Sequence, residues 1–282
     1  MKKTKFIRKA ILFLTLTGSA MFYYAWQIEP FDVEFVELEM EIENLPQELE
    51  GKTLMQISDT HIGDRFDYKY LIENFQKAQQ MNPDIVVYTG DFLAYKSPKQ
   101  FQQLAEVSPH FVKGKLGTIG VLGNHDYGKN WAEPDVANRI ARDLETAGIQ
   151  ILRNESLEVQ GLTILGMDDL YGTHFEGEKL MKTYRKSAAY LVLCHNPDAL
   201  DLPIWNDYRG WILSGHTHGG QVKLPFFRPP VLPVKNKNYS SGKIELNDGR
   251  TLYINRALGH TYQIRFNVRP EITLFKLKAK KI

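Results

Sequence analysis

The chain has 282 residues, enough to bury one substantial core, and its composition is that of an ordinary folded protein. Its formal charge is +2, but residues 1–28 carry five Lys and Arg and no Asp or Glu, so the remainder holds 30 basic against 33 acidic residues, a net charge of −3. This balance argues against nucleic acid as a partner, and the single cysteine, Cys194, excludes an internal disulfide and a cysteine-rich zinc site.

The N-terminus has the pattern of a membrane segment. A basic tail, residues 1–9, precedes an uncharged apolar segment, residues 10–27. As a helix, its roughly 17 apolar residues would be about 26 Å long, at the short end of what crosses a bilayer. Tyr23, Tyr24 and Trp26 end the segment, where an interfacial aromatic belt lies. We expect a single-pass anchor in the cell membrane, with the tail in the cytoplasm and the main domain outside it; a cleaved signal peptide is the alternative.

The rest of the chain predicts alternating strands and helices, followed by a half that is richer in strands. Residues 28–50 are expected to form a linker and a first, half-buried edge strand, because apolar residues alternate there with Glu. The further strands are expected at 53–58, 84–88, 118–122, 149–153, 156–159, 162–166, 190–194, in the apolar run from Trp211, and at 242–246, 250–254 and 271–277. The helices are expected at 67–82, 98–107, 133–147 and 175–187. This order indicates one α/β domain over residues 51–282, with two mixed sheets packed as a sandwich and helices outside.

Residue types that bind metals follow five of the apolar strands. They are Asp59 and His61, Asp91, Asn124 with His125 and Asp126, His195, and His216 with His218. In α/β sheets the loops at the carboxyl ends of strands converge, so we expect these side chains to meet. Carboxylate, imidazole and amide ligands without thiolate fit Mn, Fe(II) or Zn.

The stretch Gly215-His216-Thr217-His218-Gly219-Gly220 has the most informative spacing. Histidines two residues apart point to opposite faces of a straight strand, so they share one centre only if the chain turns. They can also hold two adjacent metals, one each, and this is our interpretation. The glycines would let the backbone pass close to the site.

Together, the motifs resemble the calcineurin-like metallophosphoesterases across residues 53–222. The motifs are Asp59-x-His61, Gly90-Asp91, Gly123-Asn124-His125-Asp126, His195 and Gly215-His216-Thr217-His218. The resemblance implies a four-layer α/β/β/α sandwich with two metals at its rim. It implies that Asp59, His61 and His218 bind one metal and that Asn124, His195 and His216 bind the other, with Asp91 bridging them. It also implies that His125 faces the scissile phosphate and that Asp126 orients His125.

Finer motifs are similar to a bacterial, often membrane-anchored subgroup of this family. They are Gly219-Gly220-Gln221-Val222, Asn255-Arg256 and Arg265 to Glu271, with Ala257 a small departure from the pattern. That subgroup includes phosphodiesterases and hydrolases of UDP-2,3-diacylglucosamine pyrophosphate. We therefore expect a hydrolase of phosphodiester or pyrophosphate bonds in a lipid-linked or cell-envelope substrate, with a metal-bridging hydroxide as nucleophile.

Two other classes of function are compatible with the sequence. The enzymatic alternative is a phosphomonoesterase or nucleotide phosphodiesterase. A non-catalytic scaffold that binds a partner protein is remote, because no ligand position is eroded. The metal, among Mn, Zn and Fe, and the oligomeric state are left open by the sequence. Arg65 is a candidate phosphate or head-group contact, and Asp168 with Asp169 is interpreted as a turn. The Pro-rich loop, residues 225–233, either contacts lipid or is a plain surface loop.

Overall fold

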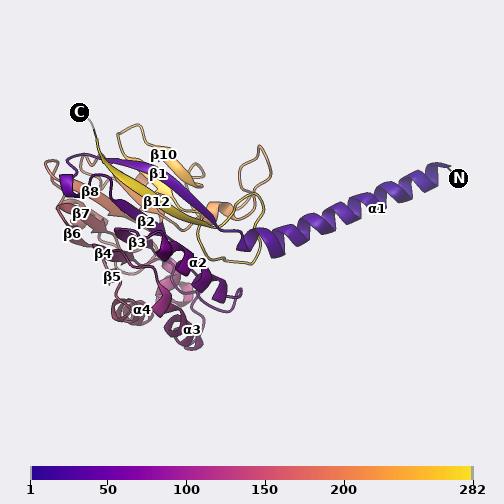
Figure 1. The fold of residues 1–282 in the computed structure, drawn as a ribbon, viewed down its shortest axis with the longest axis horizontal. Helices are drawn as coiled ribbons and strands as arrows, with labels where there is room; N and C mark the ends of the chain where they lie inside the picture. The colour runs from indigo at the N-terminus through magenta and orange to yellow at the C-terminus, as the bar shows by residue number, and fades with distance from the viewer. Residues whose placement is uncertain (1, 281–282) are drawn as a thin grey trace.

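Two six-stranded mixed sheets face each other in the computed structural model, which describes residues 2–280 (Figure 1). The first sheet has the order β1-β12-β2-β3-β4-β5, and the second has the order β10-β11-β9-β8-β7-β6. The strands of the first sheet are β1 (Glu34–Ile42), β2 (Thr53–Ile57), β3 (Ile85–Thr89), β4 (Gly117–Val121), β5 (Gln150–Ile151) and β12 (Glu271–Ala279). Those of the second sheet are β6 (Glu155–Val159), β7 (Leu162–Gly166), β8 (Ala189–Leu193), β9 (Trp211–Ser214), β10 (Gly242–Glu245) and β11 (Thr251–Ile254).

The strand directions confirm the expected mixed sheets. β2, β3, β4 and β5 run parallel, and β12 joins them antiparallel to β2. β1 lies at the edge, as its alternation of apolar and acidic residues predicts, and it runs parallel to β12. In the second sheet β7, β8, β9 and β11 are parallel, with β6 and β10 antiparallel at the two edges.

The central strands are apolar throughout because both of their faces are covered. In β3, Ile85 and Val87 pack between the two sheets, whereas Val86 and Tyr88 pack on the helical side. β8 alternates in the same way, with Leu191 between the sheets. Successive strand residues point to opposite faces, so a strand buried on both sides reads as a continuous apolar run.

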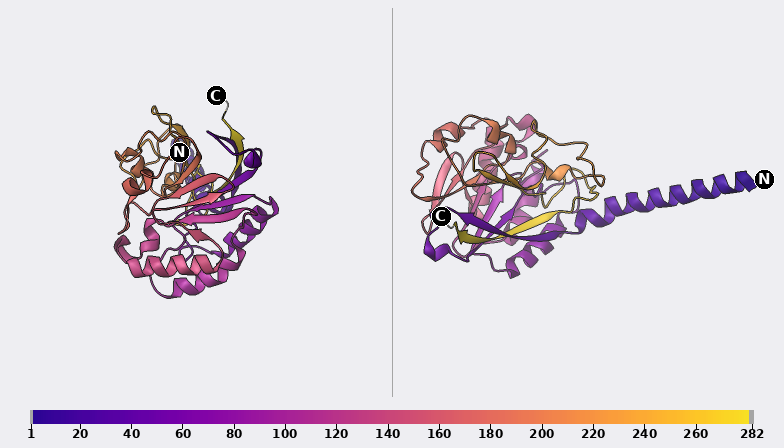
Figure 2. Two further views of the ribbon diagram at one scale, coloured as in Figure 1. Left: turned by 90° about the vertical axis from the view of Figure 1, so that its left-hand side faces the viewer. Right: turned by 90° about the horizontal axis from the view of Figure 1, so that it is seen from above.

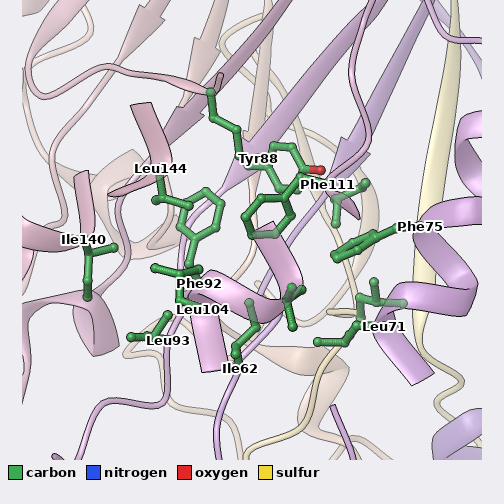
Figure 3. Close-up of a cluster of buried hydrophobic side chains, with 14 of the residues drawn as sticks. Ile62, Leu71, Phe75, Tyr88, Phe92, Leu93, Leu104, Phe111, Ile140 and Leu144 are labelled. Carbon is green, nitrogen blue, oxygen red and sulfur yellow. The ribbon is translucent and has the colours of Figure 1, made fainter. Parts of the chain in front are cut away.

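Three helices cover the outer face of the first sheet: α2 (Lys69–Gln80), α3 (Lys99–Val107) and α4 (Pro134–Thr146) (Figure 2). Tyr88, Phe92 and Phe111 form the centre of this layer, with ring centroids 5.4–6.1 Å apart (Figure 3). The outer layer over the second sheet is thinner. It consists of α5 (Gly177–Met181), a 3₁₀ turn at Pro197–Asp201 and the segments around them.

The helix expected over residues 175–187 is wrong in extent, since α5 ends at Met181. The next residues form turns, in which the N–H groups of Thr183 and Tyr184 bond to carbonyls three residues earlier. The Tyr184 ring packs edge-on against Tyr190 and Tyr208, at 5.0 and 5.2 Å. This packing of aromatic rings outweighs the helical pattern of the sequence after Met181. The strand expected at 149–153 is likewise only the two-residue β5.

The helix α1 (Lys2–Tyr23) extends away from the domain and continues as a π-helical turn, Tyr24–Ile28, and a 3₁₀ turn, Glu29–Phe31 (Figure 1). By length and composition it could cross a membrane, and a signal sequence near an N-terminus has the same length and composition. Its end is held to the domain: the N–H of Arg265 donates to Ala25 O at 2.8 Å, and Gln263 Nε2 donates to Trp26 O at 3.1 Å.

Candidate metal centre

The residues predicted as metal ligands follow the carboxyl ends of five strands from the two sheets. Asp59 and His61 follow β2, Asp91 follows β3, Asn124 follows β4, His195 follows β8, and His216 and His218 follow β9. Below them, Gln56 Nε2 on β2 joins the sheets by donating to Ser214 O at 2.9 Å. The sandwich therefore brings the loops of both sheets to one edge.

Three overlapping clusters of potential ligand atoms form at this edge. Within each cluster the atoms lie within 4.8 Å of one another. The clusters are Asp59-His61-His218, His61-Asp91-His125 and Asp91-His195-His216. Asp91 Oδ2 is 3.6 Å from His61 Nε2 and 3.2 Å from His195 Nε2. Asp91 therefore lies between the cluster that contains Asp59 and the cluster that contains His216.

The donor set fits divalent cations. His61 Nε2 and His218 Nε2 are only 2.9 Å apart, and Asp59 Oδ1 is 3.3 Å from the latter. The side-chain oxygen and nitrogen of Asn124 are both buried without a hydrogen-bond partner among residues 2–280. Such atoms are costly in a folded protein unless another group satisfies them. A cation beside Asn124 would satisfy Oδ1, whereas Nδ2 is a donor and would need an acceptor.

Two backbone carbonyls fix the orientation of two histidines. Thr89 O lies 2.7 Å from His195 Nδ1, and Pro233 O lies 2.9 Å from His216 Nε2. Because a carbonyl only accepts hydrogen bonds, each of these ring nitrogens carries a proton. In the neutral rings the other nitrogen, Nε2 of His195 and Nδ1 of His216, then has a free lone pair, as a metal ligand requires.

The electrostatics of the buried groups suit cation binding. Burial lowers the pKa of His61 well below its usual value and that of His216 to about 4, so both rings are neutral at neutral pH. Burial alone would raise the pKa of Asp91, but His195 and His125 outweigh it and hold that pKa well below the usual value. Burial also opposes charge on His195, yet Asp91 raises its pKa; a cation binding between them would release that proton.

His125 and Asp126 have different surroundings. The half-buried His125 ring meets His61 edge-on at 4.9 Å, and its backbone N–H donates to Asp91 Oδ1 at 2.8 Å. The carboxylate of Asp126 accepts hydrogen bonds from the N–H groups of Leu93 and Gly123, at 3.0 and 2.9 Å. Burial and nearby Asp91 raise its pKa to about 7. Asp126 thus ties two ligand-bearing loops together, and its orienting of His125 stays a prediction.

A buried arginine supports the loop beside Asp59. All the donors of Arg265 are used, by His260 Nδ1 and by the carbonyls of Arg256, Ala257, Gly259 and Val268. Burial lowers its pKa to about 10, so it is charged at neutral pH. The loop that Arg265 holds contacts the ligand loop directly, since the N–H of Gly259 donates to Asp59 O at 2.8 Å.

The glycine before His216 is required by the close approach of a ligand. A Cβ atom on Gly215 would lie 2.2 Å from Asp59 Oδ2 and 2.0 Å from Ser58 Oγ. We expect Gly215→Ala to displace the Asp59 carboxylate and to weaken metal binding by about 10–100-fold, the range for residues that support a ligand. The metal content of the purified protein, titrated against a chelator, measures this.

Gly117→Ala is the matched control. Gly117 begins β4, and a Cβ there would meet only the flexible end of Ile119 closely, at 3.2 Å. It should keep the metal affinity of the unaltered chain. Equal affinity in the Gly215 variant would show that the close approach has no bearing on the site.

Several neighbours of the site escaped the sequence reasoning. The rings of Trp131 and Tyr171 stack at 5.4 Å, and they flank His125 and His216 at 6.4 and 5.8 Å. Trp131 has a left-handed backbone with φ 60°, which is unusual for a bulky residue. No signal in the sequence joins these two rings, because they come from loops 40 residues apart. The carbonyls of Thr89 and Pro233 left no signal either, since every residue has one.

Residues outside the proposed ligand set have other partners. Arg65, a candidate phosphate contact, donates to Thr261 O at 2.6 Å. Asp169 forms the expected turn, accepting from the N–H groups of Tyr171 and Gly172, and burial raises its pKa to about 7. His260 is buried and accepts from Arg265.

Comparisons with known proteins place these observations in a family. Residues 52–220 match the family model described as calcineurin-like phosphoesterase. A Bacillus subtilis protein named uncharacterized metallophosphoesterase YkuE is 31% identical over 277 residues, which cover 94% of this chain and 92% of that protein. The UDP-2,3-diacylglucosamine pyrophosphatase LpxG of Chlamydia muridarum is 24% identical over 324 residues, covering 96% and 98%. The phosphodiesterase YaeI of Escherichia coli is 27% identical over 202 residues, covering 70% and 72%.

Proposed function

Because this chain belongs to the calcineurin-like phosphoesterase family and is a phosphoester hydrolase, we propose that it cleaves phosphodiester or pyrophosphate bonds at a dinuclear metal centre. The observation that carries this is the position of Asp91, whose Oδ2 atom is within 3.6 Å of ring nitrogens from both halves of the site. Asp59, His61 and His218 would hold one cation, Asn124, His195 and His216 would hold the other, and Asp91 would contribute to both.

The chemistry then divides between the cations and the side chains. When bound, two divalent cations polarise phosphoryl oxygens and activate water at neutral pH. Asp59 and Asp91 offset part of the cationic charge, whereas Asn124 is neutral and leaves the site attractive to a phosphate anion. His125 faces the phosphoryl group, where a proton transfer to the leaving oxygen would be worth about 10²–10⁴ in rate. Burial lowers the pKa of His125, so the neutral ring predominates at neutral pH before the substrate binds.

The proposed substrate is a lipid-linked or cell-envelope phosphodiester or pyrophosphate. Two relatives support this class by their names, a pyrophosphatase for UDP-2,3-diacylglucosamine and a phosphodiesterase. The apolar α1 supports it further, because an anchored enzyme is held next to lipid substrates. Turnover across lipid pyrophosphates, phosphodiesters and monoesters tests it. Faster turnover of monoesters than of all the others would contradict it.

Metal dependence is tested on the same full-length protein. Removing metal with a chelator should abolish turnover, and adding back Mn, Zn or Fe(II) separately should restore it and identify the preferred ion. Turnover that survives complete metal removal would overturn the dinuclear mechanism.

We also propose that α1 anchors the enzyme in the cell membrane with the domain outside the cytoplasm. The basic residues before the apolar segment support this orientation, since such residues stay on the cytoplasmic side. Protease added to intact protoplasts should then digest residues 28–282. Full protection of the domain would reverse the orientation.

A further inference from the structure

A cluster of exposed apolar side chains lies on the loop of residues 223–231, which we name the rim loop. Phe226 is 104% exposed, Val231 71%, Phe227 67% and Leu224 54%. Phe226 also has a left-handed backbone, with φ 68°. Large side chains of this kind are normally buried, and a contiguous exposed group marks an interaction surface.

The rim loop begins beside the end of α1. The N–H of Lys223 donates to Phe266 O at 2.9 Å, and the neighbouring Arg265 donates its N–H to Ala25 O at 2.8 Å. A cavity of about 360 Å³ lies here, and both Tyr24 and Pro225 line it. Figures 1 and 2 show this orange loop region on the side of the domain from which α1 leaves.

The other end of the rim loop reaches the metal centre. Pro233, two residues beyond it, accepts through its carbonyl from His216 Nε2 at 2.9 Å. Gly220, two residues after His218, lies so close to the rim loop that a Cβ there would be 2.3 Å from Pro229 Cβ. The rim loop therefore begins beside the segment that holds the helix end, and it ends two residues before the carbonyl that contacts a proposed metal ligand.

We propose that the rim loop enters the interface of the bilayer from which α1 emerges, so that the metal centre opens at the lipid surface. The bilayer is the occupant because further exposed apolar side chains lie near the rim loop. Tyr262 is 70% exposed, and its carbonyl accepts from Gln221, two residues before the loop; Trp26, also exposed, accepts through its carbonyl from Gln263. Aromatic side chains are favoured at the interfacial depth.

The chemistry of the rim loop fits the same partner. Lys223 and Arg228 are exposed among the apolar side chains and suit anionic lipid head groups. Pro225, Pro229 and Pro230 restrict the backbone, so little conformational entropy is lost when the loop inserts. This inference concerns how the domain lies on the membrane and does not depend on which phosphate ester is hydrolysed.

Fluorescence quenching on vesicles tests the position of the rim loop. The full chain with Phe226→Cys, labelled with an environment-sensitive fluorophore, is reconstituted into vesicles containing phosphatidylglycerol and nitroxide-labelled lipids. Cys194 stays in place because it is buried. Leu14→Cys on α1 reports insertion of the helix. Ser187→Cys is the water-exposed control. Its neighbour Lys186 accepts through its carbonyl from Asn44, which follows the end of β1 that points away from α1.

The proposal predicts nitroxide quenching and a blue shift for the label at 226, as for the label at 14, with neither effect at 187. A label at 226 that behaves like the one at 187, while the label at 14 is quenched, overturns the proposal and points to a protein partner for the loop. An unquenched label at 14 overturns it as well, because the helix would then not lie in the bilayer.

A functional comparison separates this inference from the proposed function. The double variant Phe226→Ser and Phe227→Ser should lose about tenfold or more in turnover of a phosphodiester lipid in vesicles, because it lacks the two exposed rings that we propose the bilayer buries. Its turnover of a soluble aryl phosphodiester should not change. Equal loss on both substrates contradicts the proposal. If the unaltered chain cleaves neither substrate, the proposed function fails while the quenching result still decides the position of the loop.

Discussion

Asp91→Asn should reduce hydrolysis of a phosphodiester by more than about 100-fold, since residues that only support a metal ligand already cost about 10–100-fold. The change keeps the size of the side chain but removes the charge that lies between the two halves of the site, within 3.6 Å of His61 and 3.2 Å of His195. An amide does not offer two anionic oxygens to two cations. Metal analysis of the purified variant should accordingly find less than two ions per chain.

The matched control is Asp143→Asn on α4, where the partly exposed Asp143 pairs with Arg139 at 3.8 Å. Exposed pairs of this kind contribute little, so activity and metal content should stay those of the unaltered chain. Circular dichroism of both variants checks that they are folded. Full activity in the Asp91 variant would exclude the bridging role and, with it, the dinuclear mechanism.

His125→Asn should lower kcat by about 10²–10⁴, the range for a group that transfers or stabilises a proton in the transition state. His125 lies next to the centre, with its ring 4.9 Å from that of His61, but it is more exposed than the proposed ligands. Because we assign it to the phosphoryl group, the variant should retain both metal ions. The measurement is kcat on a soluble aryl phosphodiester together with metal content.

The metal content decides between two roles for His125, because its ring also belongs to a cluster with His61 and Asp91. A variant that loses activity and one metal together would make His125 a ligand and contradict our assignment. His110→Asn is the control: His110 is exposed after α3, outside the three clusters. Its kcat should not change.

Most of the architecture and the types of residue at the site follow from the amino-acid sequence. Apolar strands such as β3 and β8 had to be buried on both faces, and their alternation placed one face between the sheets. Asp, Asn and His after five strand ends predicted a cluster, because parallel strands of one sheet end at the same edge. The predicted extent of α5 was wrong because Tyr184 packs against Tyr190 and Tyr208, and helical periodicity does not report contacts with residues beyond the helix.

The geometry that gives these residues a function depends instead on how the loops meet in the folded protein. The carbonyls of Thr89 and Pro233 determine which ring nitrogen of His195 and His216 can bind a metal. Every residue has a carbonyl, so the sequence does not identify these two. The stacking of Trp131 on Tyr171 likewise depends on how separate loops meet. Residue types and periodicity specify what a chain can bind and which faces it buries. Distances between loops, and hence the direction of each lone pair, arise only when the two sheets pack together.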